Sequence, residues 1–141
     1  MKAWRAPLLH CLADPGEASD PAAWEYFEDG LLLVDQGKVV AAGDADALLA
    51  GPAANAEVTD YRGKLLVPGF VDCHVHFPQL DIIGSFGVQL LDWLNQYAYP
   101  AEAKFADPDH AREVAAAFLE ELLRNGTTTA LVFGTVHAHS A

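Results

Sequence analysis

The clearest periodic pattern in the chain lies between residues 108 and 124. Apolar side chains recur there at intervals of three and four residues, which places them on one face of a helix. Asp107 is a good N-cap, Pro108 suits the first helical position, and Asn125-Gly126 provides a stop. The pattern therefore predicts an amphipathic helix that begins at Pro108, with this apolar stripe: Ala111, Val114, Ala115, Phe118, Leu119 and Leu122.

Two strand patterns flank this helix. Residues 69–76 form an apolar run with polar residues at alternate positions, and residues 127–133 are β-branched and apolar without alternation. We expect the first strand to be buried and the second to be covered on both faces. Residues 77–107 form a long insertion, predicted as a loop followed by an aromatic-rich stretch over 90–105. Together these segments predict one parallel βαβ crossover whose long loop covers a site.

Residues 1–67 have the pattern of β structure with turns. The stretch 2–11 is predicted as an edge strand, because Pro7 lacks the N–H that a ladder needs. The runs 30–34 and 38–42 are typical of a hairpin with a bulge, joined by a three-residue turn that ends in Gly37.

Shorter elements complete this N-terminal region. Residues 15–21 are rich in Pro, Gly and Ser and predict a loop, and residues 44–50 predict one helical turn that Gly51-Pro52 ends. Residues 58–67 carry a further pair of short strand-like runs on either side of Gly63. We therefore divide the chain into a β region, 1–67, and a βαβ region, 68–141.

Length and charge narrow the function classes. The chain has 141 residues, and a closed (β/α)₈ barrel needs about 250. Acidic residues outnumber basic ones by 20 to 8 and are spread over both halves, which excludes a basic nucleic-acid patch or a polybasic membrane anchor.

No apolar run approaches the ~18 residues of a membrane span, and the N-terminus is a poor signal peptide. Two distant cysteines make a disulfide framework improbable. These features predict a cytoplasmic protein with no nucleic-acid or membrane partner.

The candidate chemistry lies at the end of the first predicted βαβ strand, in the run Asp-Cys-His-Val-His at residues 72–76. Alternate side chains of a strand share a face, so Asp72, His74 and His76 point one way. Two imidazoles at this spacing can both reach one divalent metal ion. Cys73 points away from that face, and we expect it to be a small buried residue and not a nucleophile.

Residues 68–76, Pro-Gly-Phe-Val-Asp-Cys-His-Val-His, resemble the first barrel strand of the amidohydrolase superfamily, which carries the pattern PGxxDxHxH. The N-terminal strands resemble the small β domain of that superfamily. Four further motifs resemble the guanine deaminases within it, especially the bacterial ones, and lie at residues 77–79, 89–97, 99–102 and 125–130. The resemblance covers nearly the whole chain and is strongest from residue 65 onward.

The resemblance implies an α/β fold. Residues 68–141 are expected to be the start of a (β/α)₈ TIM-type barrel, with about two of its strands, and residues 1–67 part of a small β-sandwich domain. The implied activity is hydrolytic deamination of guanine to xanthine and ammonia, with one Zn²⁺ per active site and a homodimer when the protein is complete. Since the remaining ligands and the proton-shuttling residue fall outside the sequence, we expect an N-terminal portion, either a fragment or a chain that needs a second chain, that is inactive alone.

The resemblance also assigns residues by position. His74 and His76 are two of the zinc ligands, Gln79 hydrogen-bonds the purine, and Trp93 is a candidate wall of the pocket. A carboxamide suits the role of Gln79, because it offers both a donor and an acceptor. Asp72 is expected to hydrogen-bond behind the metal-binding histidines and not to bind the metal, and His137 is a weaker candidate for such a place. No residue of the chain is assigned to proton transfer.

Three alternatives stay open. The protein could be another amidohydrolase that acts on cytosine, a triazine or a related amidine. It could be a non-catalytic metal-binding module, because His137-Ala138-His139 is a second pair of alternate histidines after the second strand. It could also be a structural fragment that neither binds metal nor turns over a substrate.

Overall fold

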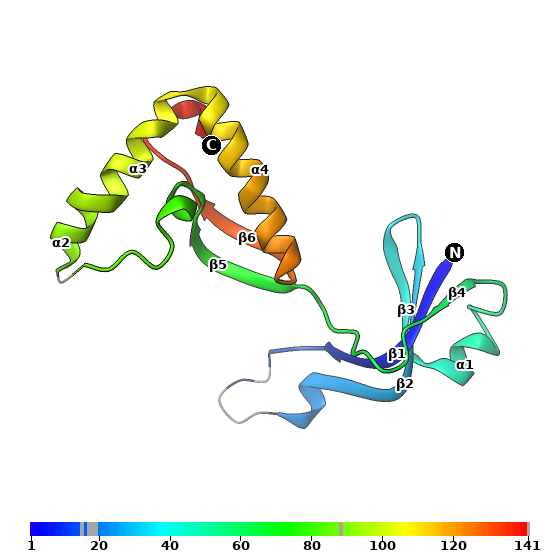
Figure 1. The fold of residues 1–141 in the computed structure, drawn as a ribbon. Helices are drawn as coiled ribbons and strands as arrows, with labels where there is room; N and C mark the ends of the chain where they lie inside the picture. Colours follow the sequence, from blue (N-terminus) through cyan, green and yellow to red (C-terminus); the bar gives the residue numbers. More distant parts are fainter. Residues whose placement is uncertain (15, 17–19, 88, 141) are drawn as a thin grey trace. The chain divides into compact units, whose positions relative to one another are not determined.

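The computed structural model describes residues 1–14, 16, 20–87 and 89–140 of a mixed α/β chain. The chain divides into two compact units, Met1–Pro68 and Gly69–Ala141 (Figure 1). Of the predicted loop at 15–21, residues 15 and 17–19 lie outside the described residues. The assignment of the two regions to a small β domain and to the start of a barrel stays a prediction.

The first unit is built on a four-stranded sheet in the order β3-β2-β1-β4. Its strands are β1 (Lys2–Cys11), β2 (Trp24–Asp35), β3 (Lys38–Asp44) and β4 (Glu57–Asp60). Neighbours pair antiparallel, except that β1 and β4 are parallel. A 3₁₀ turn at Pro21–Ala23 precedes β2.

The predicted edge position of β1 is wrong, because β1 lies inside the sheet between β2 and β4. Pro7 is tolerated there because the register of β1 against β2 shifts between Ala6 and Leu8, a bulge at which no ladder donor is needed. Gly30 faces this bulge. A Cβ at Gly30 would stand 2.5 Å from the Cβ of Leu8, so the close approach of β2 to the bulge requires glycine.

The predicted hairpin is confirmed, with a tighter turn. Strands β2 and β3 are joined by two residues, Gln36 and Gly37, both with positive φ (47° and 77°). Such a two-residue turn matches the twist of the strands, and the bulge lies instead between Leu33 and Val34. Of the predicted second run after Gly63, Leu66 makes an isolated parallel bridge with Leu8.

The predicted helical turn after β3 is also confirmed. Helix α1 (Ala45–Leu49) is capped by Asp44, whose Oδ1 accepts a hydrogen bond from the backbone N–H of Ala47 at 2.9 Å. One small core lies in this unit and joins the sheet to α1. Its buried residues are Ala3, Leu31, Leu33, Ala45 and Ala53.

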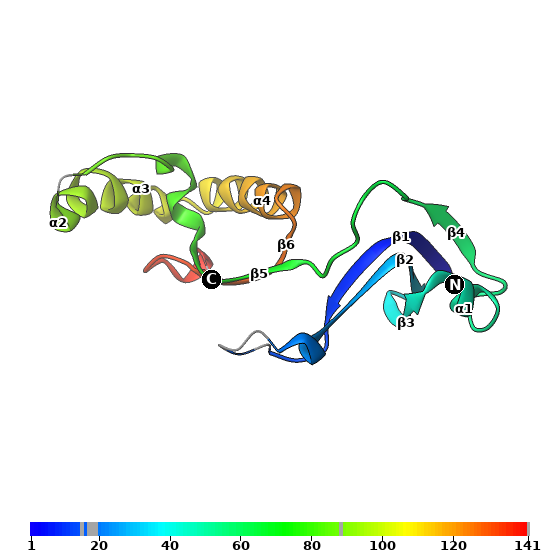
Figure 2. The same ribbon diagram turned by 90° about the horizontal axis from the view of Figure 1, so that it is seen from below.

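The second unit contains the predicted βαβ crossover. Strands β5 (Phe70–His76) and β6 (Thr127–Phe133) pair in parallel, and helix α4 (Pro108–Arg124) lies along one face of the pair (Figure 2). Asp107 caps α4 through its Oδ1, which accepts from the N–H of Asp109 at 2.9 Å, and Gly126 follows the helix with φ 80°. The core of this unit consists of Phe77, Phe105, Ala111, Val114 and Phe118.

The predicted burial of both strands is wrong for the chain as described. Leu131 is 63% exposed and Phe70 is 59% exposed, and Leu119 of the helix stripe is 58% exposed. Two paired strands are both edge strands, and α4 covers one face of them. Nothing else among residues 69–87 and 89–140 covers the other face, which explains the exposure of side chains whose pattern is typical of a buried sheet.

The insertion between β5 and α4 is more helical than predicted. It begins with a 3₁₀ turn at Phe77–Ile82 and continues with α2 (Leu90–Trp93), a π-helical segment at Leu94–Ala98, α3 (Tyr99–Ala103) and a second 3₁₀ turn at Lys104–Ala106. The π segment is followed directly by α3, which has Pro100 in its first turn, where the missing N–H is tolerated. No helix in the described part of the chain is long and apolar enough to cross a membrane.

Candidate metal and substrate site

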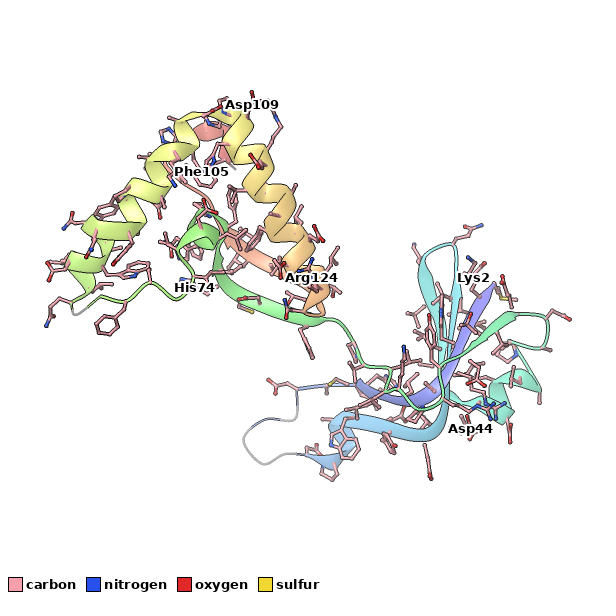
Figure 3. All side chains as sticks on the ribbon, in the orientation of Figure 1. Lys2, Asp44, His74, Phe105, Asp109 and Arg124 are labelled. Carbon is pink, nitrogen blue, oxygen red and sulfur yellow. The ribbon has the colours of Figure 1, made fainter. Side chains whose placement is uncertain are left out.

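His74 and His76 converge at the C-terminal end of β5, on one face of the strand. Their Nε2 atoms lie 3.2 Å apart, and the ring centroids are separated by 5.3 Å at a tilt of 35°. Figure 3 shows His74 on β5, in the unit that also carries the helical insertion. The register of β5 against β6 shifts between Asp72 and Val75, so the strand is irregular where it carries His74.

The donor set fits a divalent metal ion. Two nitrogen ligands at about 2.0–2.1 Å in a tetrahedral site stand ~3.3 Å apart, close to the separation of the two Nε2 atoms. Neutral imidazole nitrogen is a preferred zinc ligand. Among residues 1–14, 16, 20–87 and 89–140, no group of three or more His, Cys, Asp or Glu side chains is arranged to hold a metal. The assignment of His74 and His76 as ligands therefore stays a prediction.

Phe133, at the end of β6, supports the two imidazoles. Its ring centroid lies 4.8 Å from the centroids of both His74 and His76, and its plane is within 14° of the His76 ring. The parallel register pairs His76 with Phe133, so the two side chains share a face. Sequence reasoning missed this residue. Its position could have suggested it, because Phe133 is the last apolar residue of the predicted strand 127–133. That strand was expected to pair with the strand that carries the two histidines.

Asp72 and Cys73 occupy the strand before the histidines. The Oδ1 of Asp72 accepts from the backbone N–H of His74 at 3.0 Å, so this carboxylate holds the strand backbone and not an imidazole ring. Cys73 is exposed, and its predicted burial is wrong. Val75 packs against the core cluster around Phe77, whereas Cys73 does not belong to that cluster.

A cavity of about 370 Å³ joins the predicted site residues. His74, His76, Gln79 and Trp93 all line it, together with Ser85 and Ile83. The volume lies at the lower end of the range of small-molecule sites, which is about 300–1,000 Å³. The structure therefore brings the two candidate ligands and the two candidate substrate-binding residues to one place.

Trp93 is held against the segment before α2. Its indole Nε1 donates to the Oγ of Ser85 at 2.9 Å and lies 3.2 Å from the Ser85 carbonyl oxygen. A Cβ at Gly87 would stand 2.5 Å from the Cβ of Trp93, so this contact requires glycine. Sequence reasoning missed Ser85, because nothing in a local pattern pairs a loop serine with a tryptophan eight positions later.

Gln79 is placed by the 3₁₀ turn that directly follows His76. The two residues before it, Phe77 and Pro78, are buried and fix the backbone of the turn. The Nε2 of Gln79 donates to Oε1 of Glu102 on α3 at 3.2 Å. Glu102 belongs to one of the motifs that carry the family resemblance, but the sequence assigned it no role.

The second histidine pair lies after β6. The rings of His137 and His139 stack at 5.9 Å, and a ring nitrogen of His139 contacts the carbonyl oxygen of Phe105. Neither is among the described residues that line the cavity of His74 and His76. The role of His137 beside the pocket stays a prediction, and the arrangement in the described part of the chain does not assemble a site from all four histidines.

Comparisons with known proteins place this geometry in a family context. Residues 65–141 match the family model described as "Amidohydrolase family". The chain is 52% identical over 119 residues to guanine deaminase of Escherichia coli (strain K12), which covers 84% of the chain and 27% of that protein. The sequence similarity therefore extends over both units.

Solved structures give the same result. Guanine deaminase from Bradyrhizobium japonicum matches with a TM-score of 0.90 and 34% identity over 99% of this chain and 30% of that one. Guanine deaminase from C. acetobutylicum, with bound guanine in its active site, matches with a TM-score of 0.79 and 29% identity over 99% of this chain and 31% of that one. The chain thus spans less than a third of the length of each of these relatives. The similarities confirm the resemblance that the motifs carry.

Proposed function

The chain belongs to the amidohydrolase family, and from that premise we propose that the whole protein is a zinc-dependent guanine deaminase, which hydrolyses guanine to xanthine and ammonia. The observation that carries the proposal is the convergence of His74 and His76 at 3.2 Å, in one cavity with Gln79. The identity of 52% to a guanine deaminase supports the choice of substrate. The proposal includes a (β/α)₈ barrel of which the second unit forms the start, a homodimer and a cytoplasmic location.

The proposed reaction replaces the exocyclic amino group of guanine by oxygen from water. Water adds at C2 of the purine and ammonia leaves, so guanine and water are consumed and xanthine and ammonia are formed. His74 and His76 would hold the metal ion through their Nε2 atoms. When bound, a zinc ion supplies activation of water at neutral pH, because it lowers the pKa of water to about 7.

Gln79 and Trp93 would orient the purine beside that centre. The carboxamide of Gln79 offers an acceptor and a donor to the edge of the base, and the Trp93 ring provides an apolar wall that displaces water. Their positions are set by buried Phe77 and Pro78 for the first residue and by Ser85 for the second. Orientation matters for the rate, because a misplacement of about 1 Å can cost on the order of 10²-fold.

A steady-state assay of the whole protein tests this proposal. Zinc-loaded protein is incubated with guanine, cytosine or an amino-triazine, and ammonia release and the purine product are followed. We expect ammonia and xanthine in equal amounts from guanine, and a kcat/KM at least about 100-fold lower on the other two substrates. Removal of the metal should abolish turnover, and added zinc should restore it.

Each alternative has its own outcome in that assay. Preferred turnover of cytosine or the triazine would replace guanine as the substrate while keeping the family chemistry. Stoichiometric metal without turnover of any of the three would favour a metal-binding module, and replacing both His137 and His139 by Ala would then remove the metal. A protein with neither metal nor turnover would overturn the proposal.

A further inference from the structure

The side chain of Gln79 is tied to the helical insertion through Glu102. The hydrogen bond from Gln79 Nε2 to Glu102 Oε1 spans 23 positions of sequence at 3.2 Å, within the ordinary range for N–H···O. Glu102 is half-buried on α3, beside buried Ala101, and α3 packs against the turn that carries Gln79. The bond therefore joins two separately positioned segments of backbone and not neighbours on one helix.

The carboxylate of Glu102 fixes the orientation of the Gln79 carboxamide. An ionised carboxylate has only acceptors, so the nitrogen of Gln79 must face Glu102 and its oxygen must point elsewhere. A glutamine without such a partner can exchange its oxygen and its nitrogen by rotation of the terminal torsion, because that torsion is broad and roughly two-fold. A carboxylate at position 102 removes this ambiguity.

The surroundings of Glu102 point to the same role. None of the ion pairs formed within the described part of the chain includes Glu102, although eight other Asp and Glu side chains do take part in them: Glu25, Asp29, Asp35, Asp46, Asp60, Asp109, Glu120 and Glu121. Glu102 is also not among the described residues that line the cavity, whereas Gln79 is. Its hydrogen bond to Gln79 is therefore the contact through which it reaches the site.

We propose that Glu102 is a positioning residue that sets the polarity of Gln79 toward the substrate, an inference that rests on the proposed function. With its nitrogen held by Glu102, Gln79 presents Oε1 and its one remaining N–H to the cavity that His74 and His76 line. The edge of the purine that meets Gln79 must then offer an N–H donor to Oε1. The preference for a base edge with an N–H donor therefore depends on Glu102, although Glu102 touches neither the substrate nor the metal.

Two substitutions of Glu102 test the polarity directly. Glu102→Gln keeps an acceptor but adds a donor, so both orientations of Gln79 become satisfied and only part of the population is competent. We expect kcat/KM for guanine to fall between about twofold and about fivefold. Glu102→Lys offers only donors and turns the oxygen of Gln79 away from the cavity, so we expect a fall of about tenfold or more.

A double-mutant cycle separates positioning from damage to the fold. In a Gln79→Ala background the same two Glu102 substitutions should change kcat/KM less than twofold, because the residue through which Glu102 acts is gone. Glu113→Gln, which removes one carboxylate from an exposed position of α4, is the matched control and should leave kcat/KM unchanged. Zinc content and the thermal unfolding midpoint are measured for every variant.

The outcomes distinguish this inference from the proposed function. An active enzyme in which the Glu102 substitutions cost the same with and without Gln79 overturns the inference alone, as does an active Glu102→Lys variant with unchanged kcat/KM. An unmodified, zinc-loaded protein that releases no ammonia from guanine overturns the proposed function, and the inference with it. If the Glu102 substitutions lower kcat/KM in the parent but not in the Gln79→Ala background, with normal zinc content, the result supports both the proposed function and this inference.

Discussion

The strands of the two units bury their apolar residues to different degrees, since β1 and β2 contain buried residues and β5 and β6 contain none. In the first unit, Ala3, Leu31 and Leu33 are fully buried, because helix α1 and the turn around Ala53 pack against the four-stranded sheet. In the second unit, Leu131 and Phe70 stay about three-fifths exposed on a sheet of two strands. Antiparallel neighbours are supplied by short turns, whereas each additional parallel strand requires a crossover of a dozen or more residues.

The candidate site lies in the unit with the smaller sheet. His74 and His76 lie at the C-terminal end of a parallel strand, which is where α/β barrels place their reacting groups. The comparison teaches that a cavity and two converging histidines can form on a sheet whose other face is exposed. We therefore expect substitutions of the buried leucines to lower mainly the free energy of unfolding, and substitutions of the two histidines to lower mainly the activity.

The largest expected effect concerns the two candidate ligands. His74→Ala and His76→Ala should each lower kcat/KM for guanine at least about 10³-fold in the whole protein, because loss of even an outer hydrogen-bond partner of a metal ligand costs about 10–100-fold. Zinc content should fall as well, measured by elemental analysis of the dialysed protein. The control is His10→Ala in the first unit, where His10 pairs with Glu25. Full zinc and full activity in either ligand variant would contradict the assignment.

The second prediction compares one leucine from each unit. Leu31→Ala, in the closed core, should lower the free energy of unfolding by about 2–5 kcal/mol. We propose that further barrel strands cover β6 in the whole protein, so Leu131→Ala should cost about 2 kcal/mol or more there. Urea denaturation of each variant gives both values, with exposed Leu12→Ala as the control. A cost within about 0.5 kcal/mol for Leu131→Ala would show that this face of β6 stays open to solvent.

The smallest expected effect concerns pH and lies in the first unit. The Arg62 guanidinium hydrogen-bonds the Asp60 carboxylate, with Nε 2.9 Å from Oδ2, and lowers the pKa of Asp60 to about 2 from its ordinary 3.8. Because the folded-state pKa is lowered, the contribution of Asp60 to stability is fully present above pH 3.8 and is lost as the pH falls toward 2.

Asp60→Asn tests that sign. The unfolding midpoints of the parent and the variant should differ by a small constant amount from pH 7 to about pH 4.5 and should converge as the pH falls further. The pair is solvent-exposed, so added salt should shrink the difference at pH 7 as well. A gap that grows on acidification would be inconsistent with the lowered pKa.

Much of the second unit could be predicted from local pattern. The bounds of α4 follow from a cap at Asp107, a stripe with helical spacing and a stop at Asn125-Gly126, and the structure confirms all three. The parallel pairing of residues 70–76 with 127–133 follows from the apolar runs around that helix. The bounds of α4 depend on residues within a few positions of one another, whereas the pairing of β5 with β6 also uses the general rule that a helix joins two parallel strands.

The wrong predictions have separate physical causes. Pro7 predicted an edge strand, but a bulge opposite Gly30 removed the need for its missing donor and allowed β1 into the middle of the sheet. Apolar runs predicted covered strands in the second unit, but burial depends on how many neighbours a strand obtains. The aromatic-rich stretch predicted no regular element, yet it folds as short helical segments joined through a π turn.

The sequence by itself determined the candidate chemistry: two histidines on one face at the end of a strand, followed three residues later by a glutamine. The tertiary structure decided what surrounds them. Phe133 lies against both imidazoles, Ser85 holds Trp93 at the cavity, and Glu102 orients the amide of Gln79. Phe133 and Glu102 lie more than twenty positions from their partners, and such contacts depend on the path of the chain, which no local pattern specifies.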